Sequence, residues 1–424
     1  MTATAVPVRA VPAPSRLPAR FVIAAIAVAA ALTAIAVAGL ALRNTIWMLE
    51  LDFKVYHVTG SAVLNGISPY DAASSDGFLF IYPPFTALTF IPLGLMNIDV
   101  AFALWTFANV LALEAAIWIA LGLVERESPV RRAKFTLLAT VAGLPLAPMM
   151  MHLGVGQINI LLMLLVIADL ARRPGRFQGV LVGIAAGIKL TPLIFVVYFL
   201  VTRRIRAAVV SAATFLATVL VGFLVLPGPS ARWWGDLVLD TGRMTPSGTA
   251  PFNQSIRGVL AQLPGALAAS WLWLTLSILV GLAGLAISAW SSRRGMEAAG
   301  IIACAVTGLL VSPVSWPHHW MWVVPGLALW LWWAWHRKNL AHATGVTLAW
   351  LMMAASGVLT FLIVVGVPFL PDASVVMPKS LTAVVVLNSL TVVAALGFLG
   401  TLAVVLWRRD KRSAFGDLVS LSRP

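Results

Sequence analysis

The first residue that could carry out chemistry is Asp52, in the segment LDFKVYH directly after the first apolar run of the chain. A carboxylate this close to the edge of a membrane is costly and usually functional. The alternative is a loop carboxylate paired with Lys54, and position alone favours neither interpretation. Lys54 and Tyr56 are candidate sugar or acceptor ligands. Asp71 and Asp76 lie in SPYDAASSDG, whose composition is typical of a solvated turn.

The second candidate is Lys189, a lysine within the apolar sequence GIAAGIKLTP. It must either extend its amine to the membrane interface or meet an anion such as phosphate. Residues 177–202 are apolar yet flanked by arginines at both ends, and two full crossings would need about 40 residues. We therefore expect a re-entrant pair of short helices broken by Gly183, Gly187 and Pro192, with Lys189 near the outer tip. Irregular backbone at membrane depth is tolerated only where it lines a cavity, so a cavity is expected here.

The third candidate is the histidine pair in SPVSWPHHW, His318 and His319. Adjacent residues on a helix point about 100° apart, so the pair should not chelate one metal, and only one ring should face a cavity. The alternative is a pair of interfacial histidines in an aromatic belt formed by Trp316, Trp320 and Trp322.

Further polar side chains lie in two outer segments. Amides in the turn HLGVGQIN could bind sugar hydroxyls or cap helices, and the candidates there are His152, Gln157 and Asn159. In the loop at 227–266 the candidate phosphate partners are Arg243 and Arg257, with Arg232 nearby, and the candidate sugar or acceptor ligands are Asn253 and Gln254. Taken one at a time, these loop residues are typical of a protein surface.

The elements that must position these residues are membrane helices. The 424 residues are 60% apolar and 10% charged, against about 25% charged in an average soluble domain. We expect about ten full spans, at 21–43, 99–124, 135–152, 156–171, 206–226, 267–290, 297–313, 317–335, 343–369 and 381–407. The single cysteine, Cys304, excludes an intramolecular disulfide and a cysteine metal site. No nucleotide-binding, zincin or EF-hand motif occurs, and no nucleic acid partner is expected despite the net charge of +14.

The distribution of basic residues predicts the topology. All but seven of the 29 lysines and arginines fall in alternate loops and in the two tails, which places both termini in the cytoplasm. The exceptions are Arg43, Lys54, Lys189, Arg232, Arg243, Arg257 and Lys379. Residues 44–98 and 227–266 then form two long extracytoplasmic loops. We expect a disordered tail at 1–20, one transmembrane catalytic domain at 21–407 and a cytoplasmic tail at 408–424.

Taken in order, six segments resemble one enzyme family: DFKVYHVTGSAVLNGISPYD, YPPFTALTFIPL, GQINILL, AGIKLTPLIF, NQSIRG and SPVSWPHHW. The chain is similar to the actinobacterial polyprenol-phosphate-mannose-dependent mannosyltransferases of glycosyltransferase family 87, which have the GT-C fold. Within that family the resemblance is greatest to the α-1,2-mannosyltransferases of phosphatidylinositol mannoside synthesis. It covers residues 50–320, and the order of the motifs carries it.

The resemblance implies an all-α bundle in the cell membrane whose active site faces outward. It implies inverting transfer of mannose from polyprenyl-phosphate mannose, a substrate rather than a cofactor, to a phosphatidylinositol mannoside. It also implies a catalytic aspartate, which maps onto Asp52, and a functional histidine at His318 or His319. Phosphate binding by Lys189 and an arginine is our own inference from charge and position. We expect no required metal and a monomer surrounded by membrane lipid.

Three other interpretations remain open. A flippase or transporter of a lipid-linked sugar also needs a cavity with a few charges, but such folds often carry paired broken helices and only one pair is found. A GT-C enzyme could use another sugar, such as arabinose, or another acceptor, as in lipomannan branching. A non-catalytic scaffold ranks last, because it would have no reason to retain Asp52 and Lys189 at costly positions.

Overall fold

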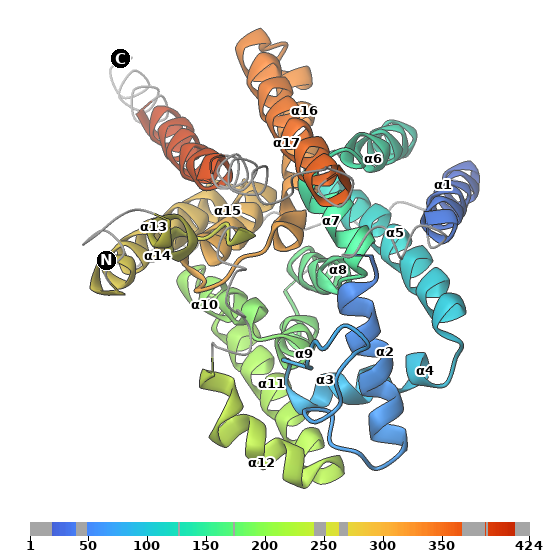
Figure 1. The fold of residues 1–424 in the computed structure, drawn as a ribbon. Helices are drawn as coiled ribbons and strands as arrows, with labels where there is room; N and C mark the ends of the chain where they lie inside the picture. The colour runs from blue at the N-terminus through green and yellow to red at the C-terminus, as the bar shows by residue number, and fades with distance from the viewer. Residues whose placement is uncertain are drawn as a thin grey trace, which may run out of the picture.

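The computed structural model describes residues 19–39, 49–125, 128–172, 174–240, 252–262, 270–366, 386 and 389–411 (Figure 1). The described residues are mostly helical, and their one β contact is an isolated bridge between Ala73 and Leu79. The α-helices are α1 (Ala19–Gly39), α2 (Leu51–Leu64), α3 (Pro84–Thr89), α4 (Ile91–Gly94), α5 (Ile98–Gly122), α6 (Pro129–Gly143), α7 (Ala147–Val155), α8 (Asn159–Leu170), α9 (Val180–Ile188), α10 (Ile194–Val201), α11 (Ile205–Val225), α12 (Pro227–Gly235), α13 (Ile256–Ala261), α14 (Ser270–Arg293), α15 (Glu297–Val311), α16 (Val323–His336) and α17 (Leu340–Gly366). Three 3-10 helices, η2 (Thr191–Leu193), η3 (Leu237–Leu239) and η7 (Pro317–Trp322), complete the order.

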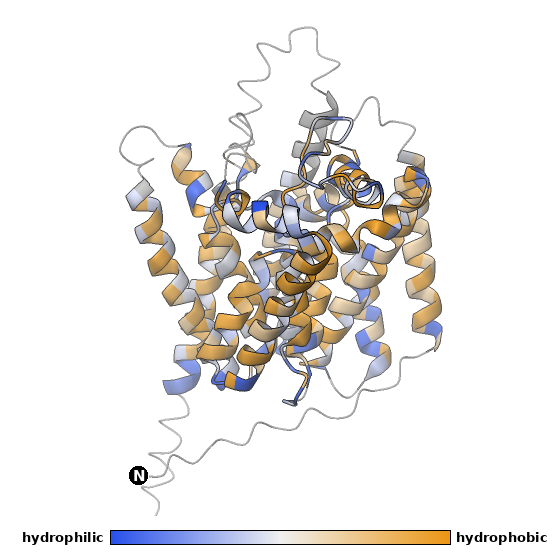
Figure 2. Ribbon diagram, turned by 90° about the horizontal axis from the view of Figure 1, so that it is seen from below, coloured by the Kyte–Doolittle hydropathy of each residue, from blue (hydrophilic) through white to orange (hydrophobic). Residues whose placement is uncertain are grey.

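Five described helices are long and apolar enough to cross a membrane: Ala19–Gly39, Ile98–Gly122, Ile205–Val225, Trp271–Arg293 and Ser389–Lys411. Hydrophobic residues run along most of the length of the bundle (Figure 2). Shorter apolar helices lie at Asn159–Leu170, Thr191–Val201, Glu297–Val311 and Leu340–Ser356. The chain is therefore an all-α membrane protein.

The straight span expected at 135–152 is wrong in detail. Two helices, α6 and α7, cover this segment and meet at 77°. The break follows Gly143, and Pro148 stands in the first turn of α7. Because proline is tolerated in a first turn but not in a helix interior, α7 starts a new helix there.

The pair of short helices expected at 177–202, which we call the re-entrant pair, is present as two oppositely directed helices. Helix α9 ends at Ile188, Lys189 has an extended backbone (φ −148°, ψ 134°), and η2 with α10 follows. The closest approaches of α9 to α11 pair Gly179 with Ala207 and Gly187 with Thr218, so the two helices run in the same direction. Because α10 leads back to the start of α11, α9 and α10 enter and leave at the same end of the bundle.

The role expected for two glycines in this pair was wrong. Gly183 and Gly187 do not break the helix but lie inside α9, on the face that packs against α11. An added Cβ on Gly183 would lie 2.5 Å from the Ser211 carbonyl oxygen, and one on Gly187 would lie 2.1 Å from the Thr218 hydroxyl. Small residues four apart allow such close helix packing in membranes. The break occurs two residues beyond Gly187, and Pro192 lies within η2.

The two long loops pack together beside the tip of the re-entrant pair, at what we call the tip end. An ion pair joins Arg232 of α12 to Asp71, and the Tyr70 and Trp233 rings stack with centroids 5.5 Å apart. The Thr86 hydroxyl of α3 donates to the Ile188 carbonyl at the end of α9. Residues from the two segments therefore lie together at one end of the bundle.

Basic clusters gather at the opposite end, which we call the arginine end. Arg204 pairs with Glu297 at 2.7 Å, and Arg294 pairs with Asp410 at 2.7 Å. These pairs join the starts of α11 and α15 and the ends of α14 and the C-terminal helix. Members of two of the predicted basic clusters, Arg204 and Arg294, therefore lie at the same end of the bundle.

Candidate active site

Asp52 lies in the first turn of α2, at the tip end. The helix follows Glu50, whose backbone is left-handed (φ 60°) and whose N–H donates to the Gly154 carbonyl at 2.8 Å. Such a conformation is uncommon for a non-glycine residue and persists only where the surroundings hold it. The position of Asp52 is therefore set by the end of α7 as well as by its own helix.

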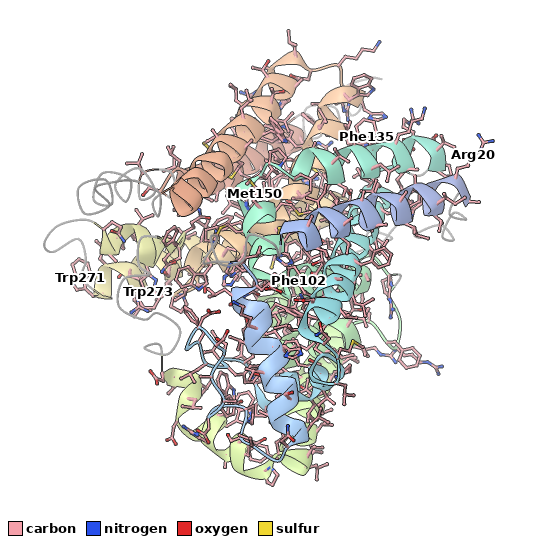
Figure 3. The ribbon with its side chains drawn as sticks, turned by 45° about the vertical axis from the view of Figure 1, so that its right-hand side comes forward. Arg20, Phe102, Phe135, Met150, Trp271 and Trp273 are labelled. Atoms are coloured by element: carbon pink, nitrogen blue, oxygen red, sulfur yellow. The ribbon has the colours of Figure 1, made fainter. Side chains whose placement is uncertain are left out.

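The turn between α7 and α8 requires a glycine. Gly156 has φ 74° and its N–H donates to the His152 carbonyl at 3.0 Å, which ends α7. A Cβ there would lie only 2.5 Å from the Phe53 Cβ of α2. Phe53 also packs against Phe102, which projects from α5 in Figure 3, with ring centroids 5.2 Å apart. Close contact between this turn and α2 brings Gln157 beside Asp52.

The Asp52 carboxylate is partly accessible to solvent but surrounded by protein. Burial raises its pKa from 3.8 to about 6, and the effect is opposed by a hydrogen bond from Gln157 and by the positive charge of Lys189. Asp52 is therefore ionised at neutral pH but more basic than an exposed aspartate. The alternative interpretation, in which Asp52 pairs with Lys54, is wrong, because the Lys54 amine binds Asp76 at 2.9 Å.

Two tyrosines extend the polar network from Gln157. The Gln157 Nε2 donates to the Tyr82 hydroxyl at 3.3 Å, and the hydroxyls of Tyr82 and Tyr56 lie 3.3 Å apart. Both rings are buried, and burial raises the pKa of each hydroxyl above 10, so both keep their protons. The Tyr82 ring also lies 5.1 Å from the Lys189 amine, which permits a cation–π contact.

Lys189 is buried at the break between α9 and η2. Its amine donates to the Asn159 Oδ1 at 3.0 Å and lies 3.1 Å from the His319 Nε2. The Asn159 Nδ2 in turn donates to the Gln157 Oε1 at 3.3 Å. Five of the residues singled out in the sequence thus form one connected cluster: Asp52, Gln157, Asn159, Lys189 and His319.

The protonation state of His319 makes this cluster rich in hydrogen-bond donors. Its Nδ1 accepts from the Trp316 N–H at 3.3 Å, so a neutral ring carries its proton on Nε2. Nε2 and the Lys189 amine, 3.1 Å apart, are then both N–H donors, so neither can accept from the other. An anion can accept from both groups at once, which suits a phosphate oxygen.

His318 and His152 lie behind this cluster. His318 is buried, its carbonyl accepts from Asn159 Nδ2 at 3.2 Å, and neither ring nitrogen has a hydrogen-bond partner among the described residues. His152 Nε2 lies 3.1 Å from the Asn109 Oδ1 of α5. Of the two adjacent histidines, the one whose ring contacts Lys189 is therefore His319.

The Asn253 side chain and the Gln254 backbone hold a loop in place. Asn253 Nδ2 donates to the Pro313 carbonyl at 2.9 Å, and its Oδ1 accepts from the Ser315 N–H at 2.9 Å. The Gln254 N–H donates to the Ser315 carbonyl at 2.7 Å. These hydrogen bonds hold the segment that leads into η7 in place, and so they position His318 and His319.

Arg257, one of the two arginines assigned to phosphate, does not join the cluster. The Arg257 guanidinium lies 5.2 Å from the ring of Trp273, which Figure 3 places on α14 at the margin of the molecule. Arg243 lies outside the described residues. Among the described residues, no three His, Cys, Asp or Glu side chains are grouped closely enough to hold a metal ion.

Sequence reasoning missed Tyr82, although a signal was present. The chain has only four tyrosines, and three of them, Tyr56, Tyr70 and Tyr82, lie in the loop at 44–98. Buried hydroxyls concentrated in one loop of an apolar protein indicate a polar site. Asn109, within the span at 98–122, carried no comparable signal.

The cavity expected beside the helix break is present. It has a volume of about 60 Å³ and lies between α8, α10 and α15. Asn159 and His319 line it together with Thr191 and Pro192 of the break. The polar cluster and the cavity are therefore continuous.

With this geometry in place, comparison with known proteins identifies the family. Residues 80–313 match the model of glycosyltransferase family 87, which is more than half of the chain. The chain belongs to glycosyltransferase family 87. The matched residues contain Tyr82, Gln157, Asn159 and Lys189, while Asp52 precedes them and His319 follows them.

Mycobacterial relatives extend the match to more of the chain. A Mycolicibacterium smegmatis protein named polyprenol-phosphate-mannose-dependent alpha-(1-2)-phosphatidylinositol pentamannoside mannosyltransferase is 36% identical over 289 residues, or 66% of this chain and 69% of that protein. A Mycobacterium tuberculosis protein named polyprenol-phosphate-mannose-dependent alpha-(1-2)-phosphatidylinositol mannoside mannosyltransferase is 32% identical over 336 residues, or 72% of this chain and 77% of its own. No solved structure matches this chain.

Proposed function

We propose that this protein transfers mannose from polyprenyl-phosphate mannose to a phosphatidylinositol mannoside, forming an α-1,2 linkage with inversion. One observation carries the proposal: a basic carboxylate and a pair of N–H donors from distant segments meet at one polar cluster beside an apolar cavity. The names of the mycobacterial relatives supply the sugar, the donor lipid and the acceptor class.

Asp52 acts as the general base in this proposal. The acceptor hydroxyl gives its proton to the carboxylate as its oxygen attacks the anomeric carbon of mannose. The bond from that carbon to the phosphate oxygen breaks, and its electron pair leaves with polyprenyl phosphate. A base whose pKa lies near 6 is suited to this role, because it is ionised at neutral pH and still accepts a proton readily.

Lys189 and His319 stabilise the leaving phosphate. The phosphate gains negative charge as the bond breaks, and the Lys189 amine and the His319 Nε2 lie 3.1 Å apart, close enough for one phosphate oxygen to accept from both. Asn159 holds the Lys189 amine, and Tyr82 covers it on another side. Because this charge comes from side chains, we propose that catalysis needs no metal, and chelation with EDTA tests this.

The membrane arrangement is part of the proposal. We infer about ten spans plus the re-entrant pair, cytoplasmic termini, and a tip end facing outward from the cell membrane, because the arginine end should stay in the cytoplasm. A membrane-impermeant thiol reagent tests this on single-cysteine variants at exposed Asp240 and Lys338, in a background with Cys304→Ala. Position 240 should react from outside and position 338 only after permeabilisation. The opposite pattern would refute the orientation.

The decisive experiment is transfer by the purified protein. Labelled polyprenyl-phosphate mannose and phosphatidylinositol mannosides are incubated with protein in lipid nanodiscs, and the product linkage is determined by mass spectrometry. We expect one added α-1,2-mannose and release of polyprenyl phosphate. In proteoliposomes lacking acceptor, movement of the donor between leaflets without transfer would support a flippase instead. Parallel incubations with arabinosyl donor and with lipomannan test the remaining alternatives.

A further inference from the structure

Arg132, in the first turns of α6 at the arginine end, carries a guanidinium that the protein leaves unpaired. Its Cζ lies 3.5 Å from the centroid of the Trp118 ring on α5, and this cation–π contact holds the guanidinium in place. Its Nε is buried and has no hydrogen-bond partner among the described residues. No ion pair links it to a carboxylate in the described part of the chain. A buried donor in this state indicates a bound water or ion.

The neighbouring carboxylate is already occupied. Glu125 is the acid whose charge acts on Arg132. Its Oε1 accepts from the Ser128 N–H at 3.2 Å, and its Oε2 pairs with the Arg131 Nε at 2.8 Å. The guanidinium instead lies against Gly122, the last residue of α5, where an added Cβ would be 2.7 Å from Nη1. Glycine here leaves space for the guanidinium on the tryptophan, and its donors stay available to a ligand.

The same tryptophan connects α1 to the bundle. The Phe21 ring of α1 stacks on Trp118 with centroids 4.7 Å apart, and Ala25 of α1 and Ala133 of α6 complete this small apolar cluster. On its outer side α1 exposes large apolar side chains such as Ile23. A ligand on the guanidinium therefore lies where α1, α5 and α6 meet, and it can affect how firmly α1 is held.

The depth of this site matches that of a phospholipid headgroup. Trp118 lies four residues before the end of α5, about 6 Å inward along the helix at 1.5 Å per residue. Two exposed cations lie at the same end, Lys134 on α6 and Arg20 at the start of α1, which Figure 3 shows next to α6. Deeper on the same two helices, Ile26 and Leu138 are exposed apolar side chains. A ligand that is anionic at the guanidinium and hydrocarbon below it fits both parts.

We propose that the Arg132 guanidinium binds the phosphate of an anionic phospholipid, and that this lipid helps to hold α1 against α5 and α6. Arginine suits this role because its planar fork of N–H groups can donate two parallel hydrogen bonds to phosphate oxygens. With the arginine end in the cytoplasm, the lipid comes from the inner leaflet, whose anionic headgroups attract basic clusters. The proposal does not depend on the sugar or the acceptor, because the site lies at the opposite end of the bundle from Asp52.

The first test measures binding to the full-length protein by native mass spectrometry, with phosphatidylglycerol and phosphatidylcholine of the same acyl chains. Wild-type protein should retain phosphatidylglycerol preferentially. Arg132→Gln should weaken that binding about tenfold, the factor expected from loss of a charge-assisted hydrogen bond. Arg132→Lys should also bind more weakly than wild type, because it keeps the charge without the planar fork.

Lys134→Gln is the matched control for this test. It removes the same charge two residues further along α6, from an exposed side chain, and should change the affinity far less than Arg132→Gln. Equal losses in Lys134→Gln and Arg132→Gln would show a diffuse basic surface and overturn the site. Equal binding of the two phospholipids by wild-type protein would also overturn it.

The second test needs no variant to establish the effect on α1. Amide hydrogen exchange is followed in wild-type protein, in nanodiscs of phosphatidylcholine alone and of phosphatidylcholine with phosphatidylglycerol. Phosphatidylglycerol should slow exchange in the first turns of α1, and Arg132→Gln should abolish this protection. Unchanged exchange in wild-type protein would refute the role of the lipid in holding α1. Equal protection by inorganic phosphate in phosphatidylcholine nanodiscs would assign the site to a soluble anion and overturn the lipid assignment.

Discussion

Replacing Asp52 with asparagine should separate catalysis from folding. Asparagine keeps the size of the side chain but cannot take the acceptor proton at neutral pH. General-base catalysis contributes about 10²–10⁴-fold, or roughly 3–5 kcal/mol, so turnover should fall by that factor.

The same substitution should make the protein more stable at neutral pH. The pKa of Asp52 is raised in the folded state, so the ionised carboxylate costs folding free energy at any pH above about 6. The difference between 3.8 and about 6 corresponds to at most about 3 kcal/mol. This cost shrinks as pH falls through 6 and disappears below about 4, where both states are protonated. Asp52→Asn should therefore raise the unfolding temperature at pH 7.5 and change it little at pH 4.

The assays are initial rates in nanodiscs and thermal unfolding of the same preparations at the two pH values. Asp76→Asn is the control, because its carboxylate pairs with Lys54 in the same loop. It should keep most of the activity. More than about a tenth of normal turnover in Asp52→Asn would refute the base assignment, since removal of a general base costs more than that. Lower stability of this variant at pH 7.5 would refute the electrostatic argument.

Three other predictions concern neighbours of this carboxylate. Gln157→Leu removes a donor that lowers the pKa of the catalytic aspartate, so the acid limb of kcat/KM against pH should move up from about 6 by about one pH unit; an unmoved limb would contradict the contact. His319→Ala should reduce kcat far more than His318→Ala, because only the first ring contacts the amine assigned to phosphate, and the reverse order would assign the role to His318. Gly156→Ala should destabilise the protein by about 2 kcal/mol or more through its positive φ and a steric clash, whereas Gly154→Ala has open space and should be tolerated.

Much of the fold could be predicted because lipid enforces simple rules. Hydropathy located the long helices, and the arginine clusters flanking residues 177–202 predicted a pair of short helices there. The 77° bend between α6 and α7 was missed, although Gly143 and Pro148 within the expected span were a signal of a break. The glycines of α9 were misread in the opposite sense. A glycine can end a helix or pack it closely, and only the position of α11 decides which.

The candidate site was predictable in part. Asp52, Lys189 and the amides of the GQIN turn were found because a polar residue in an apolar segment needs a reason to be there. Asn253 gave the same signal in the sequence, but its side chain forms hydrogen bonds that hold a loop in place. An amide can bind a ligand or stabilise a loop equally well. Arg257 was assigned to phosphate on charge alone, and its guanidinium lies over the Trp273 ring instead. A charged residue with no helix break beside it was therefore a poor indicator of the active site.

Helix interruptions explain why these particular residues meet. Gln157 follows the turn at Gly156, Lys189 occupies the extended residue after α9, and His319 lies in the 3-10 helix that begins at Pro317. Within a membrane, a backbone that leaves the helix must have its polar groups satisfied, and polar side chains at the same place can do this. Each interruption therefore supplies both a bend that brings a residue inward and a local need for polar partners. A site built in this way depends on where helices break, so glycine and proline positions fix its location while the lipid-facing surfaces between them remain free to vary.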